Sequence, residues 1–132
     1  MNNKKMKTTP KTWNRSVQPR KQRKWLAQLP LHLRNRIMSS LLTKELRKKL
    51  QRRNVAVRKG DKVKVLRGQD KGKIGSVLRV DTKKHRLFVE GLELERRNGM
   101  KVQYSIHPSK VMITELHEDK KRFKRRGYEE KR

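Results

Sequence analysis

The first 59 residues of the chain hold 19 lysines and arginines but a single acid, Glu45. Solubility alone does not require an excess of this size. Cations packed so densely repel one another in a free compact protein, whereas a polyanion beside them neutralises the charge. We therefore expect this half of the chain to bind nucleic acid, the alternative being a set of solvated helical faces.

The uneven distribution of charge and apolar residues also predicts how the chain is organised. Residues 60–116 hold 13 basic and 7 acidic residues and most of the valine, isoleucine and glycine, so the globular part is expected there. With 31% apolar and 5% aromatic residues in 132, the chain can support one small core. The predicted units are an extended basic arm over 1–19, short basic helices over 20–54, a globular unit over 55–116 and a charged tail over 117–132.

Three short helices are predicted within the basic half. The stretch that starts at Arg20, "RKQRKWLAQL", brings Trp25, Leu26 and Leu29 to one side of a short helix. Pro30 can occupy the first helical position of a second helix. Thr43 is a suitable N-cap for a third helix over "KELRKKLQRR".

The stretch "GDKVKVLRGQDKGKIGSVLRV", residues 60–80, predicts a β-hairpin because apolar and polar residues alternate on both sides of a charged loop. Gly72 in the loop can supply a positive φ or let backbone approach closely, and Gly75 in the returning strand indicates a bulge or tight bend. The predicted apolar face consists of Val63, Val65, Ile74, Val77, Leu78 and Val80.

Further short strands follow this hairpin. "HRLFVEG" predicts a strand with Leu87 and Val89 on one face, and "VMITEL" predicts another after Pro108. Between them, Asn98-Gly99 is typical of a type I′ turn leading to a strand near residues 101–105. Four or five strands without intervening helices predict a mainly β fold, an SH3-like or OB-like barrel with a partly helical basic N-terminal extension and a basic C-terminal tail.

Several classes of protein are disfavoured. The chain has no cysteine, which excludes disulfides and thiolate zinc sites and fits a reducing compartment. It has neither the apolar segment of an export signal nor a run of about 18 apolar residues that could span a bilayer. We therefore predict a cytoplasmic protein without membrane insertion.

Catalysis and metal binding are not predicted either. The four histidines are too scattered to be metal ligands on one element, and no nucleophile motif or phosphate-binding glycine loop is present. Asp61 and Asp70 are interpreted as hydrogen-bond acceptors in turns, because so few apolar residues cannot build a cleft that shifts the pKa of a carboxyl. The expectation is a protein with no enzymatic activity, cofactor or small-molecule substrate.

The stretch "RKGDKVKVLRGQDKGKIGSVLRVD" resembles the KOW motif, with Gly72 as its central glycine. Its flanks, "QPRKQRKWLAQLPLHLRNRIMSSLLTKELRKK" and "NGMKVQYSIHPSKVMITEL", are similar to the archaeal and eukaryotic form of the large-subunit ribosomal protein L twenty-four family, over residues 18–116. The short tail and the start of the leader favour an archaeal source. The resemblance implies a KOW-type SH3-like barrel and a structural protein of the large ribosomal subunit that binds ribosomal RNA. It also implies support of subunit assembly and a position near the peptide tunnel exit, beside neighbouring ribosomal proteins.

Two other functions fit parts of the sequence. A KOW-containing transcription elongation factor or other RNA-binding factor is the first alternative, but the elongation factor needs an αβ domain before the motif, and residues 1–59 lack that strand pattern. A protein-binding module is the second alternative. Phe88 and Tyr104 are too few for an aromatic-lined peptide groove.

RNA suits the basic half because arginine binds phosphate in a bidentate manner and exposed aromatic rings stack on bases. Trp13 is the predicted stacking residue, whereas Trp25 is expected to pack under the first helix. Gly68 and Gly72 are expected to present the loop cations to phosphate, a plain solvated turn being the alternative. The predicted RNA-binding residues are Trp13, Asn14, Arg15, Arg20, Lys21, Arg23, Lys24, Arg34, Arg36, Arg47, Lys48, Arg52, Arg53, Arg58, Lys59, Arg67, Gly68, Gln69, Lys71, Gly72 and Lys73.

Overall fold

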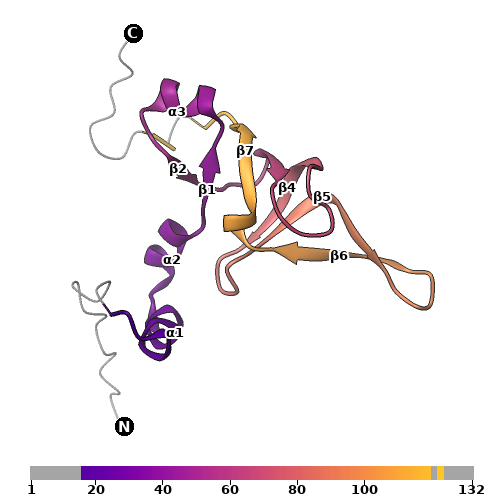
Figure 1. Cartoon of the computed structure of the whole chain (residues 1–132), viewed down its shortest axis with the longest axis horizontal. Helices are drawn as coiled ribbons and strands as arrows, with labels where there is room; N and C mark the ends of the chain where they lie inside the picture. Colours follow the sequence, from indigo (N-terminus) through magenta and orange to yellow (C-terminus); the bar gives the residue numbers. More distant parts are fainter. Residues whose placement is uncertain (1–15, 120–121, 124–132) are drawn as a thin grey trace.

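A computed structural model describes residues 16–119, 122 and 123 (Figure 1). Two helices precede one sheet, and two further helices lie between its strands in the sequence. The helices are α1 (Pro19–Gln28), α2 (Leu31–Ile37), α3 (Lys44–Leu50) and the short 3-10 helix η2 (Pro108–Lys110). The strands are β1 (Ser39–Leu42), β2 (Asn54–Ala56), β3 (Lys62–Val65), β4 (Ile74–Asp81), β5 (Arg86–Glu95), β6 (Lys101–Ile106) and β7 (Val111–Glu115). The predicted N-terminal helices are present, and the described residues form a mixed architecture of helices and one seven-stranded sheet.

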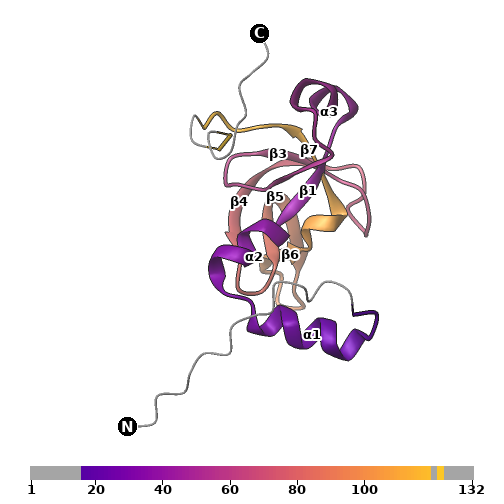
Figure 2. The same cartoon turned by 90° about the vertical axis from the view of Figure 1, so that its left-hand side faces the viewer.

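The three predicted helices are present, with small differences at their starts. Pro19 begins α1, and Pro30 is the N-cap of α2 and not its first helical residue. Thr43 is the N-cap of α3, but its side chain makes no capping hydrogen bond. In the turned view, α1 lies across one end of the molecule and α3 lies at the opposite end (Figure 2).

Strand β1 was not predicted, and it joins the basic leader to the sheet. It pairs antiparallel with β2, where Ser40 lies opposite Val55, and parallel with β7, where Leu41 lies opposite Met112. The buried Ser40 hydroxyl donates to the Pro108 carbonyl over 2.7 Å. The leader therefore contributes to the fold and is not only a ligand-binding extension.

All seven strands form one sheet in the order β2-β1-β7-β3-β4-β5-β6, with β2 and β6 at its edges. Within the described residues this order is open and does not return on itself. Strand β4 is shared between two halves of the sheet, because Ile74–Ser76 pair with β3 and Val77–Asp81 pair with β5.

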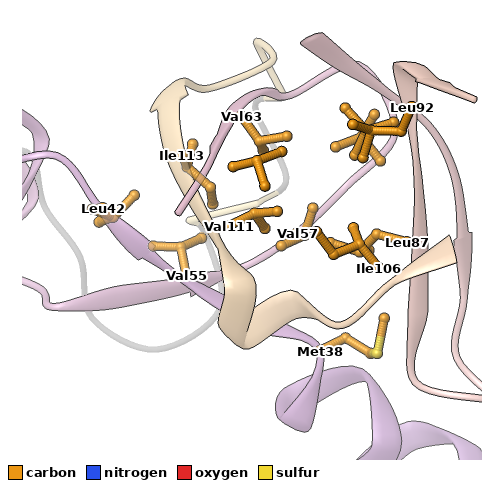
Figure 3. Packing of buried hydrophobic residues seen from close by; sticks show 13 residues of the cluster. Met38, Leu42, Val55, Val57, Val63, Leu87, Leu92, Ile106, Val111 and Ile113 are labelled. Carbon is orange, nitrogen blue, oxygen red and sulfur yellow. The ribbon is translucent and has the colours of Figure 1, made fainter. Parts of the chain in front are cut away.

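The buried apolar side chains form one hydrophobic core, most of it contributed by the strands of the sheet (Figure 3). Val63, Val65 and Val77 point inward as predicted. The predicted inward residues of the later strands are also buried, namely Leu87, Val89, Val111 and Ile113. Met38, Leu42, Val55 and Val57 come from the leader and the segment after it, so the core crosses the boundary expected near residue 54.

The predicted burial of Ile74 and Leu78 is wrong, since these side chains are 63% and 36% exposed. In a strand that buries Val77, the even-numbered neighbours lie on the other face. Ile74 and Leu78 each lie an odd number of residues from Val77, so their side chains point to the exposed face of β4. A register shift between Val77 and Arg79 then allows Val80 to pack against the core.

The turn between β5 and β6 is not type I′, because that turn needs positive φ at both central residues. Gly99 has φ 77°, whereas Asn98 is not among the residues with positive φ. The Gly99 amide donates to the Arg96 carbonyl and the Arg96 amide to the Met100 carbonyl, each over 2.9 Å. This pattern fits a three-residue loop that ends in a left-handed glycine.

The segment predicted as a tail returns to the sheet at Arg122. Its guanidinium contacts the fully buried Asp61 through two bonds, Nη1 to Oδ1 over 2.7 Å and Nη2 to Oδ2 over 2.8 Å. Nη2 also donates to the Ala56 carbonyl over 2.6 Å. The amides of Arg58 and His117 complete the partners of Asp61, each over 2.9 Å. Asp61 is thus a turn acceptor, as predicted, and also the anchor of the C-terminal segment.

Candidate nucleic-acid interface

The loop at residues 66–73 connects β3 to β4 and has a defined backbone. Gly68 and Gly72 have φ of 106° and 93°, a region that residues with a β-carbon rarely adopt. The Gly72 amide donates to the Val65 carbonyl over 2.8 Å, and the Val65 amide donates to the Lys73 carbonyl over 2.9 Å. The prediction of positive φ at Gly72 is confirmed.

The charges of this loop differ in how they are used. Lys73 Nζ lies 2.7 Å from Asp70 Oδ1, and the Tyr104 hydroxyl donates to Asp70 Oδ2. The hydrogen bonds from Lys73 and then Tyr104 hold the pKa of Asp70 below its usual range. Arg67 and Lys71 are exposed. The loop therefore presents cations on a backbone fixed by hydrogen bonds to its flanking strands.

The outer surface of α1 forms a second basic region. The helix has no buried residue and no acid in its first turn, while Trp25 and Leu26 are half-buried. Leu29, directly after it, is buried. The four predicted cations of this helix are all exposed, namely Arg20, Lys21, Arg23 and Lys24.

Two of the predicted RNA-binding arginines donate hydrogen bonds to backbone carbonyls. Arg34 donates to the Leu29 and Ala27 carbonyls over 2.8 Å each, and to the Lys83 carbonyl over 3.3 Å. It thereby satisfies carbonyls left open where α1 ends and ties the helices to the β4–β5 turn. Arg47 Nε donates to the Leu42 carbonyl over 2.8 Å. These guanidiniums are only partly available to a ligand.

The remaining predicted residues are distributed around α2, α3 and the segment before β3. Arg36, Lys48, Arg53 and Lys59 are exposed, and Arg52 is half-buried.

Arg58 pairs with Asp119. Trp13, Asn14 and Arg15 lie outside the described residues. The structure thus brings the loop cations together at one site and the α1 cations at another, and it does not bring all predicted residues into one patch.

The sequence did not predict the roles of Arg122 and Phe123. Arg122 is one cation among eight in the last 16 residues, and nothing in its neighbours distinguishes it from them. Phe123 is one of the two large apolar groups in that segment, and it packs against the core. A lone phenylalanine in a charged segment is the sequence feature that could have predicted this contact with the core.

No group of three or more potential metal-ligating side chains occurs among the described residues. Over the same residues, no helix combines the length and apolar character needed to cross a bilayer. In comparison with known proteins, residues 16–125 match the family model for ribosomal proteins L twenty-six of eukaryotes and L twenty-four of archaea.

Proposed function

Because the chain belongs to this family of eukaryotic and archaeal large-subunit ribosomal proteins, we propose that α1 and the loop at residues 66–73 bind separate segments of ribosomal RNA. The protein is a structural, non-enzymatic component of the large subunit and binds ribosomal RNA. The single observation that supports two contact regions is the separation of its exposed cations between these two elements.

The chemistry of the two regions suits the phosphate backbone. The exposed cations of α1 have no acid beside them in the first helical turn, so phosphate can neutralise them and release counterions. In the loop, positive φ at Gly68 and Gly72 turns the backbone where Arg67 and Lys71 are exposed. A preformed loop loses little conformational entropy when it binds.

We propose the predicted organisation in a modified form. Residues 1–19 form an RNA-binding arm, 20–54 carry basic helices, 55–116 form a KOW-type SH3-like barrel, and 117–132 form a charged tail. The barrel is supported by the bend of β4 between two sheet halves around one core. Since the leader supplies Met38 and Leu42 to that core, the boundary at residue 54 separates binding roles and does not separate folding units.

We also propose a position near the peptide tunnel exit, beside neighbouring ribosomal proteins there, and a contribution to subunit assembly. These proposals rest on the resemblance of the KOW stretch and its flanks.

Sedimentation of a lysate that contains the tagged full chain tests the proposed function. We expect the protein in the large-subunit fraction after a high-salt wash, and weaker retention for the variant Arg20→Ala/Lys21→Ala/Lys24→Ala. The matched control is Lys83→Ala/Lys84→Ala/Lys101→Ala, which removes the same charge at exposed positions on the β4–β5 turn and the start of β6. Recovery with RNA polymerase would support the elongation-factor alternative, and recovery only as free protein would contradict the proposed contacts.

A further inference from the structure

A shallow hollow of about 270 Å³ lies where the loop at residues 66–73 meets β6 and η2. Three exposed cations line it, Arg67, Arg86 and Lys110, together with the half-buried ring of Tyr104 and the exposed side chain of Leu94. Arg86, Tyr104 and Lys110 were not among the residues predicted to bind RNA. The hollow therefore combines positive charge with aromatic and apolar surface.

Backbone contacts hold the three cations around the hollow. The Leu66 amide, next to Arg67, donates to the carbonyl of Lys110 over 2.8 Å. Leu87 pairs with Ile106 in the β5–β6 ladder, which places Arg86 beside the end of β6. Among the described residues, no ion pair links any of these three cations to an acid. Burial is the main cause of the lowered pKa of the adjacent His107, and the nearby charges of Arg86, His85 and Lys110 lower it further.

The orientation of Tyr104 is fixed from outside the hollow. Its hydroxyl donates to Asp70, and burial together with Asp70 raises the pKa of Tyr104 to about 12. The phenol is therefore neutral at physiological pH. Lys73 pairs with the same carboxylate, so the negative charge nearest to the ring is already neutralised.

We propose that this hollow binds a single unpaired ribonucleotide of ribosomal RNA, with its phosphates on Arg67, Arg86 and Lys110 and its base against Tyr104. The proposal rests on the RNA-binding function and assigns a ligand to one part of that surface. Duplex RNA hides the faces of its bases, whereas an unpaired base can stack on an aromatic side chain. The volume lies just below the ~300–1,000 Å³ of sites that enclose drug-sized molecules, which suits one nucleotide.

The test uses the full chain, a short single-stranded oligouridylate that contains 4-thiouridine, and a duplex RNA of the same length. We expect photocrosslinks to the peptide that contains Tyr104 with the single strand and not with the duplex. Tyr104→Leu should weaken binding of the single strand on the order of tenfold, the scale of one lost stacking contact. Tyr104→Phe keeps the ring but loses the hydrogen bond to Asp70, so it should weaken binding clearly less than Tyr104→Leu does.

The cation arm of the test is the variant Arg67→Ala/Arg86→Ala/Lys110→Ala. It should abolish the crosslink and lower the salt slope of binding by up to about two units, because each phosphate contact to a single strand contributes about 0.7. The control Lys83→Ala/Lys84→Ala/Lys101→Ala should retain the crosslink.

Three outcomes would overturn the proposal: crosslinks that map elsewhere, an equal loss in Tyr104→Phe and Tyr104→Leu, or displacement of the oligouridylate by an acidic peptide but not by unlabelled single-stranded RNA. Sedimentation of the wild-type protein with large subunits is measured separately. A failure of the nucleotide site therefore remains distinguishable from a failure of the proposed function.

Discussion

At the scale of single residues, Gly72 and Gly75 are needed for different physical reasons. Gly72 has φ 93°, and a β-carbon built there would meet nothing within 4 Å. Gly75 is not among the glycines with positive φ, but a β-carbon there would lie 2.4 Å from the Glu90 carbonyl oxygen of β5. The first position requires a backbone conformation, and the second requires space.

Substitution should separate these two requirements. Gly72→Val is expected to lower the free energy of unfolding by about 1–3 kcal/mol through backbone strain. Gly75→Val should cost more, because the carbonyl cannot retreat without disturbing the β4–β5 pairing. Asparagine tolerates left-handed backbone, so Gly72→Asn should recover much of the loss and Gly75→Asn should not. Urea unfolding measures all four, and equal rescue at both positions would refute the distinction.

Asp61 and Arg122 form the most deeply buried ion pair among the described residues, with side chains 0% and 3% exposed. Removal of one member of such a pair leaves an uncompensated charge in the interior. Arg122→Ala should therefore lower the free energy of unfolding by about 3–5 kcal/mol. Arg122→Lys should lie between the alanine variant and the wild type, because lysine keeps the charge but cannot form the bidentate contact.

The control for this pair is Lys62→Ala, which removes the exposed Lys62–Glu115 contact of 2.8 Å. Exposed pairs contribute at most about 1 kcal/mol. Thermal melts should thus show a large shift for Arg122→Ala and a small one for Lys62→Ala. Similar shifts in both variants would mean that the C-terminal segment does not stabilise the sheet.

At the scale of elements, local sequence patterns predicted the long or capped segments. They did not predict segments whose structure depends on pairing with residues far away in the sequence. Helix α1 and strand β3 follow from periodicity over one stretch of sequence. Strand β1 could not be found in this way, because "SSLL" is short and its partners are β2 and β7. For the binding surface, the spacing of the α1 and loop cations predicted that they are exposed. The hydrogen bonds from Arg34 to backbone carbonyls could not be predicted, because they depend on how the helices pack against the sheet.

Truncation should reveal the contribution of β1. A chain of residues 38–132 keeps every member of the core cluster and should unfold cooperatively. A chain of residues 55–132 lacks Met38 and Leu42 and leaves the edge of β7 unpaired, so it should not give a stable native state. Circular dichroism melts and amide proton spectra compare the two. A well-folded 55–132 fragment would show that β1 is dispensable.

At the scale of the whole molecule, the net charge of +28 is carried by surfaces with different structural roles. The cations of α1 lie on a helix with no buried residue. Those of the loop at 66–73 lie on a hairpin whose strands contain the buried Val63, Val65 and Val77. Charge can therefore be removed from either region without opening the core.

Salt titrations with a domain-sized fragment of large-subunit ribosomal RNA should count the contacts of each surface. Arg20→Ala/Lys21→Ala/Lys24→Ala is expected to lower the salt slope by up to about three units and leave the melting temperature unchanged. Lys71→Ala/Lys73→Ala should lower it by up to about two units. An unchanged slope in the loop variant, with binding otherwise normal, would mean that this loop faces solvent.

The parallel pairing of β1 with β7 has a consequence for the order of events during synthesis. Leu41 pairs with Met112, so about 70 residues must be translated after β1 before its partner exists, which takes on the order of 4–14 s at ~5–20 residues per second. Throughout that interval β1 has no β7 to join. The nascent leader is therefore free to meet RNA or a chaperone before the sheet that will hold it is complete.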